Sequence, residues 1–147
     1  MIQRIQTVYL FISALLVGLL FLFPFAEISK DGIVYLFNFH GIVQNGNLIQ
    51  NGVSISALIG IIIVLQGFAI VSFKNRLRQM RLTVFSALLK ICLLGIFYFF
   101  TFYSFPEAQI SFKISGLFPS LALILDYLAI RAIKKDEALI RSIDRIR

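Results

Sequence analysis

Four long apolar segments, separated by short polar connections, are the feature that most constrains how this chain can fold. A helix needs about 20 mostly apolar residues to cross the hydrocarbon core of a bilayer. The segments lie at about residues 5–25, 53–73, 82–105 and 117–131. A mean hydropathy of +0.92 is that of a chain in lipid rather than in water. The sequence therefore predicts one membrane domain over residues 1–147, a membrane all-α fold built as a bundle of four transmembrane helices.

The connection at residues 26–52 carries the turn signals of a small antiparallel β-sheet. Three dipeptides that favour tight turns occur there: Asp31-Gly32, Asn45-Gly46 and Asn51-Gly52. The short apolar runs between them predict the strands of a β meander. In the connection after the third segment, Ile110, Phe112 and Ile114 alternate with polar residues, which predicts a further strand that pairs with the meander.

The basic residues indicate how the segments are oriented. Of 14 Lys and Arg residues, 11 fall on one side: Arg4, the four within residues 74–81, and the six after residue 130. The other side has only Lys30 and Lys113. Cytoplasmic connections carry the excess of basic residues, so both termini are expected in the cytoplasm and the sheet outside. The first segment is expected to be retained as a signal anchor, because its apolar run is too long for a signal peptide and no cleavage site of small residues follows it.

Four polar side chains, one from each segment, define the candidate site. Counting 1.5 Å per residue from the basic residues at the segment ends places Ser13, Gln66, Lys90 and Asp126 at comparable depths. A lone Lys or Asp costs about 2.5–3.5 kcal/mol within a membrane span, which favours a Lys90–Asp126 pair that fixes helix register. Two alternatives stay open. Lys90 could extend to the interface while Asp126 meets Arg131 or water, or the layer could form a pathway for protons, ions or a substrate.

Aromatic side chains crowd the second half of the third segment: Phe97, Tyr98, Phe99, Phe100, Phe102, Tyr103 and Phe105. They predict lipid contact and anchoring at the membrane interface, with an aromatic ligand pocket as the alternative.

Catalytic and metal-binding patterns do not emerge from the sequence. Ser86 and Lys90 share a helix face, but a catalytic Ser–Lys pair needs a neutral amine, and Asp126 would keep Lys90 charged. His40 and Cys92 are the only residues of their kinds and fall in distant parts of the chain, which predicts no metal site. We therefore expect no enzyme activity and no cofactor.

The C-terminal segment, residues 132–147, predicts an amphipathic helix in the cytoplasm. Its apolar residues approximate one stripe, and its basic residues suit anionic lipid headgroups. The helix would lie on the lipid surface or bind a membrane or cytoplasmic protein partner. The net charge of +7 follows mainly from the orientation bias, so no nucleic-acid partner is expected.

The two ends of the chain carry a resemblance. The opening Met1-Ile2-Gln3-Arg4-Ile5-Gln6-Thr7 and the closing residues 131–147, rich in Ile, Lys and Arg, resemble those of a Bacteroidota family of uncharacterised four-span membrane proteins. The resemblance implies a multi-pass protein of the bacterial inner membrane and carries no activity or residue roles. We expect an accessory or scaffold component of a membrane assembly; the alternative is a small transporter or channel that uses the Lys90–Asp126 layer.

Overall fold

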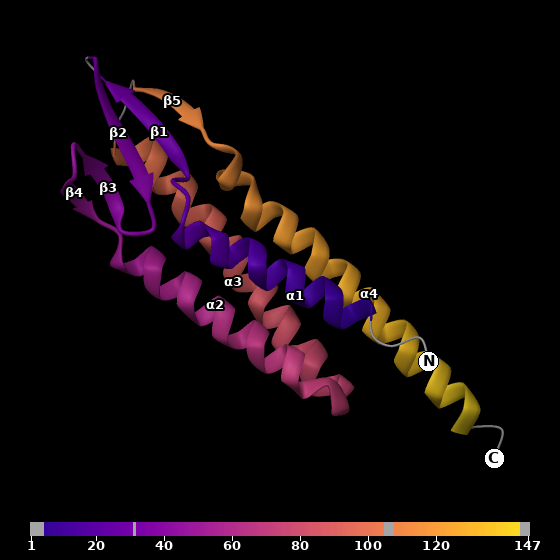
Figure 1. The fold of residues 1–147 in the computed structure, drawn as a ribbon. Coiled ribbons are helices and arrows are strands. Elements are labelled where there is room, and N and C mark those ends of the chain that lie inside the picture. Colours follow the sequence, from indigo (N-terminus) through magenta and orange to yellow (C-terminus); the bar gives the residue numbers. More distant parts are fainter. Residues whose placement is uncertain (1–4, 31, 105–107, 145–147) are drawn as a thin grey trace.

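The computed structural model combines a helical bundle with a β-sheet at one end of it (Figure 1). It describes residues 5–30, 32–104 and 108–144, and at residues 74, 104 and 139–144 it describes the backbone alone. The helices are α1 (Ile5–Gly18), α2 (Val53–Val71), α3 (Arg76–Ser104) and α4 (Phe118–Asp144). Short 3₁₀ turns follow α1 and α2 and precede α4, at Leu19–Phe21, Ser72–Lys74 and Ile114–Leu117. Each of α1 and α3 packs against both α2 and α4.

The sheet makes the all-α class predicted from the sequence wrong. Five antiparallel strands lie in the order β4-β3-β2-β1-β5, so this is a mixed fold rather than a pure four-helix bundle. Their bounds are β1 (Ala26–Lys30), β2 (Ile33–Asn38), β3 (Gly41–Gln44), β4 (Asn47–Asn51) and β5 (Gln109–Phe112). Pairing of β5 with β1 confirms that the two connections form one sheet. The sheet reaches this size because β1, which the sequence did not reveal, joins the meander to β5.

Of the turns predicted in residues 26–52, the one at Asn45-Gly46 is a hairpin and the one at Asn51-Gly52 is not. Asn45 and Gly46 have φ values of 46° and 84°, which confirms the predicted tight hairpin between β3 and β4. The predicted turn at Asn51-Gly52 is wrong. Gly52 has a φ of −106° and precedes α2, and the Asn51 side chain accepts a hydrogen bond from the Val53 N–H at 3.1 Å. Asn51 thus ends β4, and its side chain binds the first residue of α2 instead of forming a hairpin turn.

Among the described residues, three helices are long and apolar enough to cross a membrane: Val53–Val71, Arg76–Tyr103 and Ile114–Ala138. The first apolar helix is shorter and ends at Phe21, not near residue 25 as the sequence suggested. Pro24 accounts for the early end, because the residue before a proline is disfavoured in helical geometry. The chain then enters β1 at Ala26.

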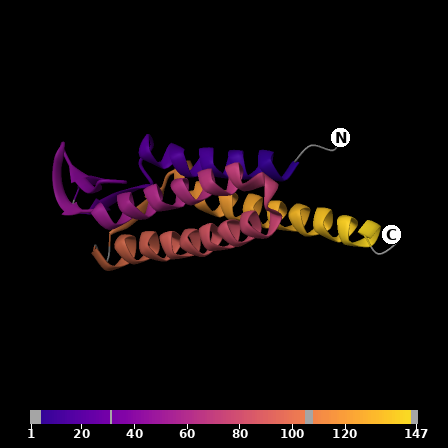
Figure 2. The same cartoon turned by 90° about the horizontal axis from the view of Figure 1, so that it is seen from below.

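The predicted C-terminal helix is present as the continuation of α4. Helix α4 runs without a break from Phe118 to Asp144 and extends past the ends of the other helices (Figure 2). The absence of Gly and Pro after Pro119 explains this continuity. Residues 145–147 of the predicted segment lie outside the described residues.

Aromatic side chains join the sheet to the bundle. The ring of Phe25 stacks on that of Phe97 at 4.2 Å between centroids, and the ring of Phe37 lies 5.8 Å from Phe97. Phe97 is therefore a core residue, whereas Tyr98 and Tyr103 are exposed on the bundle surface. Phe105 lies outside the described residues.

Candidate functional site

The four polar residues singled out from the sequence meet inside the bundle. Ser13 comes from α1, Gln66 from α2, Lys90 from α3 and Asp126 from α4, and the exposed fraction of each is 0%. Each helix carries its polar residue on the face that packs against its neighbours. The structure thus brings together one polar side chain from every helix at a single level.

An ion pair forms the centre of this layer. The Lys90 Nζ atom donates a hydrogen bond to Asp126 Oδ2 at 2.5 Å, and both side chains are fully buried. An isolated charge in an apolar interior carries a large desolvation cost, which a close partner and further hydrogen bonds offset. Asp126 and Lys90 supply each other with that partner.

The Ser13 hydroxyl connects all the members of the layer. It accepts hydrogen bonds from Lys90 Nζ at 2.9 Å and from Gln66 Nε2 at 2.8 Å. Its own hydrogen lies within reach of Asp126 Oδ1 at 2.8 Å and of the Ala122 carbonyl at 3.0 Å. Gln66 Nε2 also donates to Asp126 Oδ1 at 3.0 Å, so both carboxylate oxygens accept hydrogen bonds.

The surroundings of the layer differ on its two sides. Toward the sheet, the helices contribute a continuous apolar cluster that includes Val17, Ile62 and Leu93. Away from the sheet, a smaller apolar cluster of Leu10, Ala69 and Ala129 follows. Toward the sheet, Thr101 and Ser115 are also buried, and each donates a hydrogen bond to a backbone carbonyl. More of the described buried polar groups line the interior on the second side.

Several of those polar groups form a row along one face of α3, of which Ser86 and Lys90 were named in the sequence analysis. Gln79, Thr83, Ser86 and Lys90 recur at helical spacing, and the first three have exposed fractions of 0%. The Thr83 hydroxyl donates to the Gln79 carbonyl at 2.9 Å. The Ser86 hydroxyl and the Gln79 side-chain amide have no hydrogen-bond partner among the described residues. The sequence did not single out Gln79 or the buried Gln6 of α1, because neither carries a charge. Helical spacing from Lys90 through Ser86 and Thr83 would have included Gln79 on the same helix face.

The geometry does not suit the catalytic or metal chemistry considered from the sequence. The Lys90 ammonium donates hydrogen bonds to Ser13 and Asp126, whereas the Ser86 hydroxyl has no described partner, so Ser86 and Lys90 do not form a dyad. Within the described ranges, no three His, Cys, Asp or Glu side chains gather as metal ligands would. What the layer does provide is a set of hydrogen bonds that joins four helices, with Gln66 Oε1 as a layer atom that has no partner among the described residues.

Comparison with known protein families gives a match over nearly the whole chain. A family described as a domain of unknown function, DUF4293, matches residues 2–146. Comparison with curated proteins finds no match. The match covers nearly the full sequence, and the chain therefore belongs to the DUF4293 family.

Proposed function

We propose that this protein is a non-enzymatic integral membrane protein that serves as an accessory or scaffold component of a membrane assembly. The observation that carries the proposal is the buried layer of Ser13, Gln66, Lys90 and Asp126, in which both charges bind partners within the chain. Such a layer fixes the register of four helices and leaves no charged group directed at a substrate. The role then falls to the surfaces that the rigid bundle presents.

Two such surfaces support a contact role. Every residue of the edge strand β4 is exposed, and an exposed sheet edge offers unpaired backbone groups to another chain. At the other end, α4 continues beyond the bundle (Figure 2). A cytoplasmic or membrane protein could bind either surface without entering the polar layer.

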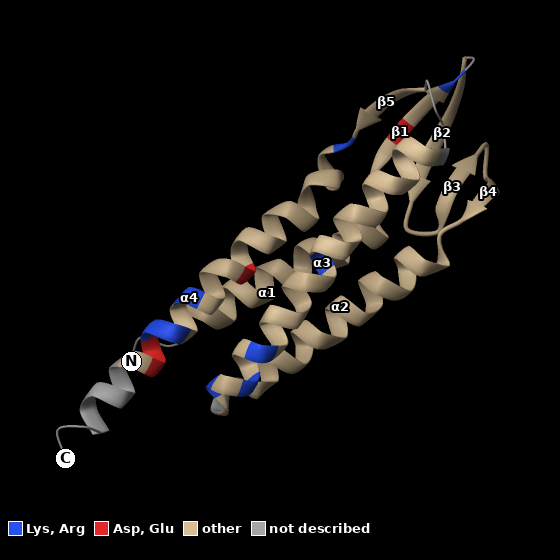
Figure 3. Ribbon diagram, turned by 180° about the vertical axis from the view of Figure 1, so that it is seen from behind, with Lys and Arg blue, Asp and Glu red and all other residues tan. Residues whose placement is uncertain are grey.

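The proposal places all four helices across the bacterial inner membrane with both termini in the cytoplasm. Most basic residues of the described chain lie at the end of the bundle remote from the sheet (Figure 3), as is typical of cytoplasmic ends. Helix α1 has 14 residues and the 3₁₀ turn after it has 3, so together they span roughly 25 Å. A short helix of this length can cross when the bilayer thins locally around it.

Purification from native membranes in mild detergent tests the scaffold role. We expect the chain to migrate within a larger assembly, and the charge-free double variant Lys90→Met/Asp126→Leu to remain in it. Loss of a partner on removal of one of the two surfaces named above, such as the end of α4 by deletion of residues 136–147, would support the role. A lone chain in native membranes, or an activity that disappears with the two charges while the fold persists, would contradict it.

A small transporter or channel is the second candidate, and one observation favours it. Buried polar atoms of Gln79 and Ser86, on the side of the layer remote from the sheet, have no hydrogen-bond partner among the described residues. Buried polar groups in proteins normally bind a partner, and water is the usual one when no side chain is within reach. Water along this row would give protons or ions access to Lys90 and Asp126 from the cytoplasmic end.

Cysteine accessibility separates the two candidates. Ser86 and Leu93 are both fully buried on α3, on opposite sides of Lys90, and form a matched pair. In a Cys92→Ala background, a wet pathway predicts that Ser86→Cys reacts with a small water-soluble thiol reagent and Leu93→Cys does not. A dry, structural layer predicts that neither cysteine reacts while the protein is folded.

A further inference from the structure

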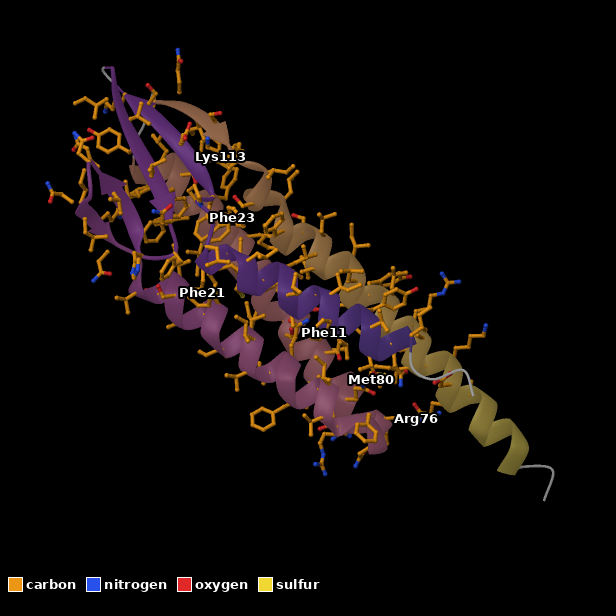
Figure 4. The ribbon with its side chains drawn as sticks, viewed as in Figure 1. Phe11, Phe21, Phe23, Arg76, Met80 and Lys113 are labelled. Atoms are coloured by element: carbon orange, nitrogen blue, oxygen red, sulfur yellow. The ribbon has the colours of Figure 1, made fainter. Side chains whose placement is uncertain are left out.

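A surface groove runs between α3 and α4 near the end of the bundle remote from the sheet. It has a volume of about 260 Å³, and its walls include the apolar side chains of Val84, Phe85, Leu88 and Ile130. Met80, which lies toward this end of the bundle, also lines it (Figure 4). Val84, Phe85 and Leu88 are exposed, so the groove opens on the surface that faces lipid if α3 and α4 cross the membrane.

Two cationic side chains from different helices line the same groove. Arg81 comes from α3 and Lys134 from α4, and both are exposed. The ion pairs found among the described side chains, Lys90–Asp126 and Lys113–Glu27, involve neither of them. Counted along the helices, Arg81 lies about 10 Å from Leu88 and Lys134 about 6 Å from Ile130, so the charges lie nearer the helix ends than the apolar walls do.

We propose that this groove binds one anionic glycerophospholipid. Its phosphate would lie between the Arg81 guanidinium and the Lys134 ammonium, and an acyl chain would follow Val84, Leu88 and Ile130. A guanidinium can bind two phosphate oxygens at once, and an ammonium adds a second positive charge. Basic pockets between helices on the cytoplasmic side suit acidic headgroups, whereas the apolar walls suit a hydrocarbon chain.

An acidic residue limits which headgroup fits. A shallow extension of the groove is lined by Met80, Lys134, Glu137 and Ala138. The Glu137 side chain lies beside Lys134 in this extension, so a headgroup with a single phosphate, which need not reach past Lys134, suits the groove best. Phosphatidylglycerol has that chemistry and is the appropriate probe.

The chain itself offers matched controls for the two cations. Arg78 and Lys135 are also exposed and lie on the same two helices, but neither lines the groove. Replacing either pair with glutamine removes two positive charges from the same end of the molecule. Diffuse attraction of lipid to a basic surface would respond equally to both changes.

Titration of the full-length protein with phosphatidylglycerol or phosphatidylcholine in detergent, followed by native mass spectrometry, tests the proposal. We expect saturable binding of one phosphatidylglycerol and at least tenfold weaker binding of phosphatidylcholine. Arg81→Gln/Lys134→Gln should weaken phosphatidylglycerol binding about tenfold or more, and Arg78→Gln/Lys135→Gln less than twofold. Equal losses in the two double variants, or equal binding of the two lipids, would overturn the assignment.

A second variant tests the acyl-chain part of the site without changing charge. Leu88→Trp should fill the groove and weaken phosphatidylglycerol binding while circular dichroism stays unchanged. Inorganic phosphate at millimolar concentration should not displace the lipid. Undiminished binding to the folded Leu88→Trp variant, or full displacement by phosphate, would show that no acyl chain occupies this groove. These outcomes do not depend on whether the protein acts as a scaffold.

Discussion

At the residue scale, Ser13 determines the geometry of the buried layer. Its hydroxyl accepts hydrogen bonds from Lys90 and Gln66 and lies 2.8 Å from the Asp126 carboxylate. A hydroxyl can donate once and accept twice, so one small side chain here contacts three helices. A larger residue would push α1 away from α4, because Ser13 also reaches the Ala122 carbonyl at 3.0 Å.

Gly41 is the residue at which the sheet tolerates no side chain. It has a φ of +121°, and a Cβ atom there would lie 1.9 Å from the Gln50 carbonyl oxygen. We expect Gly41→Ala to lower the free energy of unfolding by about 2 kcal/mol or more, through strain and steric overlap. Gly60→Ala is the control, because nothing lies within 4 Å of a Cβ at that position of α2. In thermal unfolding in detergent, Gly41→Ala should have a lower midpoint than Gly60→Ala. Equal midpoints would show that the backbone of β4 leaves room for a Cβ atom at position 41.

The sequence predicted which polar residues share a level and the pairing of Lys90 with Asp126, but not the hydrogen bonds that Ser13 and Gln66 add to this pair. Counting residues from the basic helix ends gave comparable depths for Lys90 and Asp126, because helical rise is fixed. That count cannot tell which helices are neighbours or which way a side chain turns. The central position of Ser13 and the burial of Gln79 depend on packing, so they emerge only from the assembled bundle.

At the element scale, strands with clear turn chemistry were predictable and β1 was not. Asn45-Gly46 marks its hairpin because both residues must adopt positive φ. Strand β1 has the sequence Ala-Glu-Ile-Ser-Lys, which is poor in β-formers, and it exists because β2 and β5 pair with it on both sides. Such tertiary support overrides local preference and leaves little trace in one sequence.

The continuous α4 helix leads to a prediction about truncation. Deleting residues 136–147 should leave the bundle and the sheet folded, because the polar layer and every strand precede the cut. We expect the thermal midpoint in detergent to fall by no more than a few degrees, with the helical signal reduced in proportion to the residues removed. Collapse of the fold would instead make the end of α4 part of the bundle's own packing and exclude it as a free contact surface.

At the scale of the whole molecule, most basic residues of the described chain lie at the end opposite the sheet, and only Lys30 and Lys113 of them lie beside the sheet (Figure 3). This separation predicts that the sheet is outside the cytoplasm and the α2–α3 connection inside it. In a Cys92→Ala background, Leu48→Cys on β4 should react with a membrane-impermeant thiol reagent added to intact cells. Arg78→Cys should react only after the membrane is opened. The reverse pattern would invert the topology.

The measurement that tests the central claim most directly is a double-mutant cycle on the buried ion pair. Lys90→Met and Asp126→Leu each leave one uncompensated charge within the bundle, and each should cost about 3–5 kcal/mol of folding free energy. The double variant removes both charges and should be markedly more stable than the sum of the single losses implies. The exposed Glu27–Lys113 pair, 2.7 Å apart, is the control and should show a coupling of about 1 kcal/mol or less. Strictly additive losses at Lys90 and Asp126 would mean that this pair does not hold the four helices in register.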